Sequence, residues 1–152
     1  MTARQGRCAP ALRPRPEERS TGQKLPSTPM KFIHLALRQA GRSACRFRVG
    51  AALAAGNRVL AAQPNKYRNP GRIDFRHSTF HAEEAVLRRV TAAGGTDIYV
   101  ARLDAAGRPA LARPCERCMH TLADAGVLRA HYTTAHGDVH TIDVRRAARG
   151  TA

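Results

Sequence analysis

The pattern of apolar and polar positions changes along the chain, and at each point it predicts either a helix or a strand. From Ile33 to Ala40 apolar side chains recur at three- and four-residue spacing, which is typical of a helix. From Phe47 to Leu53 they alternate with other residues, which is typical of a strand. Continued along the chain, the pattern predicts a helix at 28–41, strands at 47–53 and 59–62, a polar loop at 64–79, a helix at 81–93, a strand at 98–103, a loop at 105–113, a helix at 114–126 and strands at 128–134 and 139–144.

The order of these elements predicts one mixed sheet of five strands covered by helices, a three-layer α/β/α sandwich. The last two predicted strands are separated only by residues 135–138. A parallel pair would need a crossover of about a dozen residues. The last two strands are therefore expected to be antiparallel neighbours.

Residues 1–29 differ from the rest of the chain in composition. They hold five of the nine prolines and six of the 26 Lys and Arg residues, with few apolar side chains. Such a segment buries too little apolar surface to offset its ordering entropy. We expect a disordered basic extension at 1–29, a folded domain at 30–144 and a basic tail at 145–152. Met30 is a candidate physiological start, with a genuine flexible tail as the alternative.

The formal net charge of the 152-residue chain is +15, from 26 Lys and Arg against 11 Asp and Glu. Alone, this excess favours a nucleic-acid or anionic-surface partner. However, 23 of the 26 are arginine, and an arginine- and alanine-rich composition is also what a coding bias produces. No run of about 18 apolar residues predicts a membrane span. The first residues lack the apolar core of a secretory signal, and we expect a cytoplasmic protein.

Two short motifs carry the candidate chemistry, and each falls at the start of a predicted helix. The first is His81-Ala-Glu83, and the second runs from Pro114 to Cys118. Cys115 and Cys118 lie three residues apart on one helical face, so both sulfurs can reach one ion, with His81 as the natural third ligand. Three protein ligands leave tetrahedral zinc one open position, as in catalytic sites. Glu83 beside a zinc-activated water would move protons.

The residues alone also allow other interpretations of the second motif. Cys115 and Cys118 could form a redox pair or half of a structural zinc site. The fourth ligand of such a site would be His77, His120 or Cys45. The other residues of these types lack partners in the pattern: we expect ordinary histidines at His34, His131, His136 and His140, free thiols at Cys8 and Cys45, and a solvated helix residue at Glu84.

Together the two motifs resemble the H-x-E…P-C-x-x-C signature of the zinc-dependent cytidine deaminase superfamily. The segment from Phe47 to Leu53 resembles the F-x-V-G-A-A-L strand of the free-nucleoside cytidine deaminases, and the resemblance extends over residues 30–144. It implies the cytidine deaminase-like fold, Zn²⁺ as cofactor, and hydrolytic deamination at C4 of cytosine with release of ammonia.

The resemblance also implies roles for individual residues. Glu83 would be the general acid and base, Asn65 would contact the ribose, and Phe47 would pack against the pyrimidine. A turn residue and a core side chain are the structural alternatives for Asn65 and Phe47. The implied zinc ligands are His81, Cys115 and Cys118.

The chain departs from the free-nucleoside enzymes at three positions. His81 stands where they usually have cysteine, Tyr67 where a sugar-binding glutamate is usual, and Glu84 where arginine is usual. These differences leave a nucleoside and a nucleotide as alternative substrates.

Three function classes follow from these features. The favoured one is an enzyme acting on a cytidine-like nucleoside or nucleotide, with a homo-oligomer expected from the resemblance. The alternatives are a deaminase acting on nucleic acid and a non-catalytic zinc domain. The loop before the first motif carries three arginines that could bind a phosphate or a polynucleotide: Arg68, Arg72 and Arg76.

Overall fold

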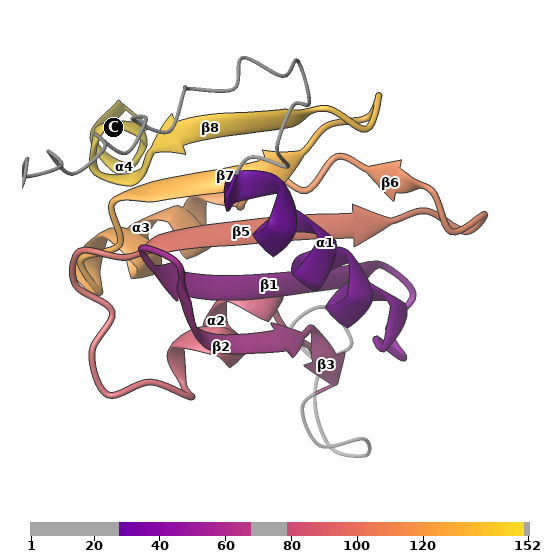
Figure 1. Cartoon of the computed structure of the whole chain (residues 1–152), viewed down its shortest axis with the longest axis horizontal. Coiled ribbons are helices and arrows are strands. Elements are labelled where there is room, and N and C mark those ends of the chain that lie inside the picture. The colour runs from indigo at the N-terminus through magenta and orange to yellow at the C-terminus, as the bar shows by residue number, and fades with distance from the viewer. Residues whose placement is uncertain (1–27, 68–78, 151–152) are drawn as a thin grey trace, which may run out of the picture.

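The structure of the chain, a computed structural model, describes residues 28–67 and 79–150. Its centre is a mixed sheet with helices on both faces (Figure 1). The strands are β1 (Arg48–Ala55), β2 (Arg58–Pro64), β3 (Lys66–Tyr67), β4 (Thr79–Phe80), β5 (Asp97–Leu103), β6 (Pro109–Ala110), β7 (Arg129–Thr133) and β8 (Val139–Asp143). The helices are α1 (Thr28–Gly41), α2 (Ala82–Leu87), α3 (Glu116–Asp124) and α4 (Val144–Gly150).

The five long strands lie in the order β2-β1-β5-β7-β8, and the short β6 pairs with β5. β5 runs parallel to β7 and antiparallel to β1, while β7 and β8 form an antiparallel pair. The predicted mixed sheet and its antiparallel final pair are confirmed. Among the described helices, none is long and apolar enough to cross a membrane.

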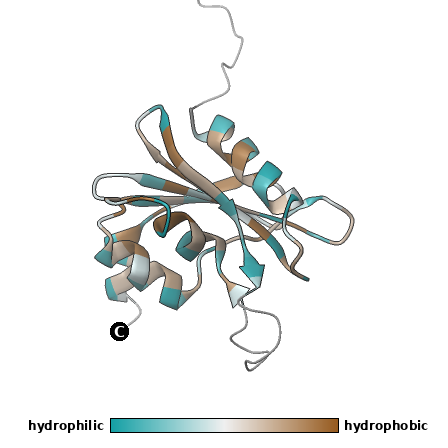
Figure 2. Ribbon diagram, turned by 90° about the horizontal axis from the view of Figure 1, so that it is seen from below, coloured by the Kyte–Doolittle hydropathy of each residue, from teal (hydrophilic) through white to brown (hydrophobic). Residues whose placement is uncertain are grey.

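Helices cover the two faces of the sheet unequally. Figure 2 shows α1 on one side and the other helices on the opposite side. The α1 face has a small core of five buried residues, and the other face has a larger one that includes Val86, Leu122 and Val144 from the three remaining helices. The α/β/α layering therefore agrees with the predicted sandwich.

Gly50 allows α1 to pack closely on β1. A Cβ built at Gly50 would overlap the carbonyl oxygen of Ala36 and the amide nitrogen of Ala40. The residues around this contact are also small, with Ala51 and Ala52 fully buried in β1. The glycine of the F-x-V-G-A-A-L segment is therefore required by helix packing.

The helix predicted at 81–93 is wrong in length, because α2 ends at Leu87. The chain continues in tighter turns, in which Arg89 N–H donates to Val86 O and Val90 N–H donates to Leu87 O. Val90 and Ala93 still pack against the larger core. They preserve helical spacing in the sequence although they lie beyond the helix.

Two predicted irregular segments contain regular structure. The loop at 64–79 contains β3 at one end and part of β4 at the other, and these strands pair with each other. The loop at 105–113 contains β6. Most of the expected tail from 145 forms α4, which extends to Gly150. This helix begins where Asp143 Oδ1 accepts a hydrogen bond from Arg146 N–H, 2.7 Å away.

Candidate active site

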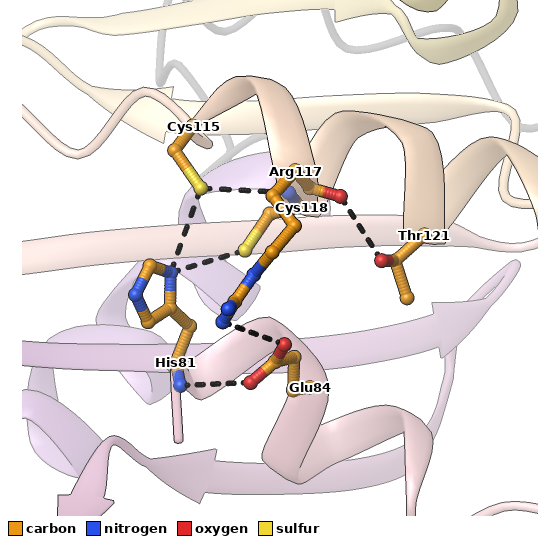
Figure 3. Close-up of polar contacts among 6 residues, drawn as sticks. All are labelled: His81, Glu84, Cys115, Arg117, Cys118 and Thr121. Carbon is orange, nitrogen blue, oxygen red and sulfur yellow. Dashed lines mark hydrogen bonds and ion pairs between the residues drawn. The ribbon is translucent and has the colours of Figure 1, made fainter. Parts of the chain in front are cut away.

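Three side chains from the two predicted motifs meet where α2 and α3 begin. His81 precedes the first turn of α2, Cys115 precedes α3, and Cys118 lies in the first turn of α3. His81 Nδ1 lies 3.2 Å from Cys118 Sγ and 3.6 Å from Cys115 Sγ (Figure 3). The fold therefore joins two segments that are more than thirty residues apart in the sequence.

The spacing of these three atoms fits a Zn²⁺ ion. All three candidate ligand atoms lie within 4.8 Å of one another. Tetrahedral zinc with ordinary Zn–N and Zn–S bonds would separate nitrogen and sulfur by about 3.6 Å and the two sulfurs by about 3.8 Å. Within the part of the chain that the structure describes, no other group of three such residues could hold a metal, and neither His120 nor Cys45 joins this one.

The chemistry of the ligand group also calls for a cation. Burial, followed by the nearby charge of Glu83, raises the pKa of the Cys118 thiol well above its usual value. A metal ion reverses this effect, because a coordinating thiol loses its proton. The start of α3 assists, since Cys118 N–H donates to Cys115 Sγ and helix N-termini stabilise thiolates.

Glu84 holds the two ligand-bearing helices together. Its Oε2 accepts a hydrogen bond from the backbone N–H of His81 at 3.3 Å, and its Oε1 accepts one from Arg117 Nη2 at 2.8 Å. The side chain of Glu84 is only 16% exposed, so the prediction of a solvated helix residue is wrong. This carboxylate fixes the backbone of one candidate ligand and links α2 to α3.

Glu83 lies buried beside the candidate metal ligands. It is 5% exposed and lines the same cavity as His81 and Cys115. Burial is the main cause that raises its pKa to about 7, and the charge of Glu84 acts in the same direction. A hydrogen bond to its own backbone and the Arg117 guanidinium oppose this shift. A carboxyl group in this environment can both hold and release a proton near neutral pH.

The cavity above these residues has a volume of about 700 Å³, which is ordinary for a small-molecule site. Phe47 and Tyr67 line it and are 56% and 50% exposed. The alternative of Phe47 as a core side chain is therefore wrong. The guanidinium carbons of Arg46 and Arg102 lie 5.5 Å and 5.0 Å from the centre of the Phe47 ring.

Asn65 lies in the same cavity wall, but its polar atoms bind the chain itself. Its Oδ1 accepts hydrogen bonds from Ser43 Oγ at 2.6 Å and from Val49 N–H at 3.0 Å. Its Nδ2 donates to the carbonyl oxygen of Phe47 at 2.7 Å. Asn65 thus holds the start of β1, and with it Phe47, against the end of β2.

Several residues of the cavity were not predicted from the sequence, although their positions beside the motifs or within a strand could have indicated them. Arg46 directly precedes Phe47, and Arg113 directly precedes the second motif. Arg102 is a charged residue that directly follows the apolar run at 98–101 of its strand. The residues Arg68, Arg72, Arg76 and His77, singled out from the sequence, lie outside the described residues.

Comparison with known proteins places the chain in a deaminase family. The family model described as "Cytidine and deoxycytidylate deaminase zinc-binding region" matches residues 26–134, so the chain belongs to this family of zinc-binding deaminases. The resemblance inferred from the two motifs is thereby confirmed. Among curated proteins, no sequence matches significantly.

Two solved structures illustrate the shared fold. Cytidine deaminase from Burkholderia pseudomallei has a TM-score of 0.60 and 20% identity, over 77% of this chain and 93% of that one. dCMP deaminase from the cyanophage S-TIM5 has a TM-score of 0.57 and 21% identity, over 72% of this chain and 85% of that one.

Proposed function

We propose that the protein is a zinc-dependent hydrolytic deaminase of a cytidine-like nucleoside or nucleotide. The observation that carries this proposal is the position of Glu83, buried in the same cavity wall as two of the three candidate zinc ligands. A purely structural zinc site has no use for a buried carboxylate beside it. The cyanophage dCMP deaminase has been solved with dCMP and dUMP, so pyrimidine nucleotides are the first compounds to test.

In this proposal His81, Cys115 and Cys118 bind Zn²⁺. A neutral imidazole and two thiolates would balance the two positive charges of the ion, and three protein ligands would leave room for water or substrate. Bound zinc would supply Lewis acidity at that position, which lowers the pKa of water. The ligand set is thus that of a catalytic site.

Glu83 transfers the protons of the reaction. As a carboxylate it accepts a proton from the attacking water and delivers it to N3 of the base. It then accepts the remaining proton of the new C4 hydroxyl and delivers it to the departing amine, as the C4 carbonyl forms. Water adds to C4, ammonia leaves, and the base becomes a uracil. The buried position of Glu83 excludes bulk water from this exchange.

The cavity wall positions the base. The exposed Phe47 ring and the apolar side chains of Val49 and Leu111 offer contacts to a flat heterocycle, and Tyr67 lies in the same wall. Asn65 lines the same cavity and holds the Phe47 backbone, and in this proposal it also contacts the sugar.

Ammonia release tests the proposal when it is measured with cytidine, deoxycytidine, dCMP, adenosine, guanine and single-stranded DNA. We expect activity on a cytidine compound and a Glu83→Gln variant that retains about one zinc per chain but loses about 10²- to 10⁴-fold in kcat. Glu116→Gln is the matched control, because Glu116 is exposed on the nearby α3 and outside the cavity lining. Activity that survives Glu83→Gln or complete removal of metal would contradict the mechanism.

The same panel separates the second candidate function. The net charge of +15 and the two exposed aromatic side chains of the cavity are also features of proteins that bind single strands. Deamination of DNA alone, with a steep loss of activity as salt rises, would favour an enzyme acting on nucleic acid.

A further inference from the structure

We propose that the cavity selects a free nucleotide over a nucleoside, and that Arg102 is the specificity-determining residue that binds its phosphate. This inference rests on the proposed function for the identity of the base. Its own basis is the distribution of charge in the cavity wall and the environment of one guanidinium group.

The described cavity wall contains more positive than negative side chains. Three arginines line it, Arg46, Arg102 and Arg113, and Glu83 is the one carboxylate among the lining residues. Glu83 lies next to the candidate metal ligands. None of the salt bridges found among the described residues involves one of the three lining arginines, so their charge can act on a ligand that brings its own negative charge.

Arg102 differs from the arginines that stabilise the fold. Arg48 donates to a backbone carbonyl, Arg108 pairs with Asp104, and Arg129 pairs with Asp97. Arg102 Nε is buried and has no hydrogen-bond partner among the described residues. Leaving a buried charged donor unsatisfied is costly, and a group of this kind in a native protein calls for an explanation.

The backbone of β5 directs Arg102 towards the candidate active site. Arg102 lies two residues beyond Val100, so both side chains are on the face of the sheet that carries α2 and α3. Its register partners are Val49 on β1 and Ala110 on β6. The strand is therefore held on both sides at this point, and its backbone N–H donates to Thr133 Oγ1 at 3.3 Å.

The Phe47 ring contacts two guanidinium groups of the cavity wall. Arg102 and Arg46 lie 5.0 Å and 5.5 Å from the centre of this ring. Positive charges that line one cavity favour an anionic ligand. A phosphate matches the planar fork of arginine through paired charge-assisted hydrogen bonds. The ring itself contacts a base or sugar, so the site combines the features of a nucleotide.

The size of the site favours a single nucleotide over a polynucleotide. The three arginines line one cavity of about 700 Å³, within the range of small-molecule sites. A nonspecific single-strand binder would instead spread positive charge along a groove that follows several phosphates. We therefore assign the cluster to the phosphate of one bound nucleotide.

Equilibrium binding tests this assignment without turnover. Zinc-loaded protein with Glu83→Gln is titrated with dCMP, deoxycytidine, inorganic phosphate and a single-stranded oligonucleotide. We expect dCMP to bind about 10- to 100-fold more tightly than deoxycytidine, the gain for charged hydrogen bonds to one phosphate. Adding Arg102→Gln should remove this gain and change the affinity for deoxycytidine by no more than about threefold.

Two further variants give the result its controls. Arg58→Gln, an exposed arginine of β2 outside the cavity lining, should leave the preference for dCMP unchanged. Arg102→Lys keeps the charge but loses the fork, and it should retain part of the preference even if Arg102→Gln folds poorly. Equal binding of dCMP and deoxycytidine, or an equal loss of both on substitution of Arg102, would overturn the assignment.

The outcomes also separate this inference from the proposed function. Preference for dCMP that depends on Arg102, without ammonia release from any compound, would support the phosphate site and reject the deaminase reaction. Ammonia release without a preference for dCMP would support the deaminase reaction and reject the phosphate site. Tight binding of the oligonucleotide with no binding of dCMP would reject the free nucleotide in favour of a polynucleotide.

Discussion

Strand β5 has a polar cluster at each end, and the two clusters differ in how their charges are matched. At its start, Asp97 accepts hydrogen bonds from Arg129 Nε, and its Oδ2 lies 2.9 Å from Arg129 Nη2 and 3.3 Å from His131 Nε2. His131 Nδ1 lies 2.7 Å from Thr141 Oγ1, and its ring stacks on Tyr99 with centroids 4.5 Å apart. Each charged group here has a partner within the chain.

Near the other end of β5, two charged groups lack matching polar contacts among the described residues. Arg102 keeps a buried Nε with no hydrogen-bond partner in the described part of the chain, and Glu83 is buried without an ion pair of its own among the salt bridges found there. The candidate metal ligands add the buried Cys118 thiol, whose pKa is raised by burial and which a bound cation would ionise. One strand thus supports a satisfied cluster and an unsatisfied one.

The two clusters show how polar groups that stabilise the fold differ from polar groups that can bind a ligand. A polar group that the fold can satisfy contributes to stability, whereas one left unsatisfied in a cavity is available to a ligand. Substitutions at the Asp97 end should therefore change mainly stability. Substitutions at the Arg102 end should change mainly binding and catalysis.

The largest effect is expected from the metal ligands. Cys118→Ser should lower zinc content from about one ion per chain to nearly none and weaken zinc affinity by more than about 100-fold, because a ligand is lost outright. Zinc content by mass spectrometry and zinc titration would measure this. Cys45→Ser is the control, since Cys45 is a buried free cysteine that lines the same cavity. Equal zinc loss in both variants would contradict the ligand assignment.

A smaller effect, and of a different kind, is expected at Asp97. Asp97→Ala should lower the free energy of unfolding by about 1–3 kcal/mol, because buried His131 loses its acceptor. The Arg129 ion pair contributes little, since that side chain is 58% exposed. Urea unfolding of the metal-free protein would measure the change.

Urea unfolding of Arg102→Gln beside Asp97→Ala compares the two ends of β5 directly. The free energy of unfolding of Arg102→Gln should stay within about 0.5 kcal/mol of the wild type, because the buried Nε of Arg102 has no hydrogen-bond partner among the described residues. Asp124→Ala, an exposed residue at the end of α3, serves as a second reference. A loss at Arg102 as large as that at Asp97 would remove the distinction between the two ends.

The smallest effect is a pH dependence at the Asp97 end. Burial is the main cause that lowers the pKa of His131 from 6.5, against the opposing influence of Asp97, while Arg129 lowers it further. Below about pH 6.5 the unfolded chain therefore binds more protons at this residue than the folded chain, and stability falls as the pH falls. The slope should be at most about 1.4 kcal/mol per pH unit.

Thermal unfolding between pH 7.5 and pH 5 would measure this slope. His131→Gln should flatten it relative to the wild type, because the titrating group is removed. His140→Gln is the control, since His140 is exposed on the neighbouring β8. A steeper decline in His131→Gln than in the wild type would show that the sign is wrong.

Much of the fold could be predicted because its signals are local. Alternation in β1, the short turn before β8 and the spacing within α1 each depend on neighbouring residues, and each prediction is confirmed. The length of α2 could not be read in this way. Val90 and Ala93 maintain the apolar spacing, but they bury their side chains from turns beyond the helix.

Some residues of the candidate site could likewise be identified from local sequence, and others could not. The three ligand residues were recognisable because their chemistry is rare and their spacing within each motif is short. Arg102 and Glu84 were not, because their roles depend on which distant residues the sheet and helices bring beside them. For α4 a local signal did exist, since Asp143 stands directly before a run rich in alanine and arginine, and aspartate is a favoured helix cap.

The link between Glu84 and Arg117 has a consequence for how the sequence can vary. Glu84 caps the start of α2 and meets Arg117 of α3 at 2.8 Å. Replacing either residue alone removes this ion pair between α2 and α3, whereas exchanging both keeps the charges matched. In evolutionary terms, we expect positions 84 and 117 to change together, because the residue at one position affects which residues are tolerated at the other.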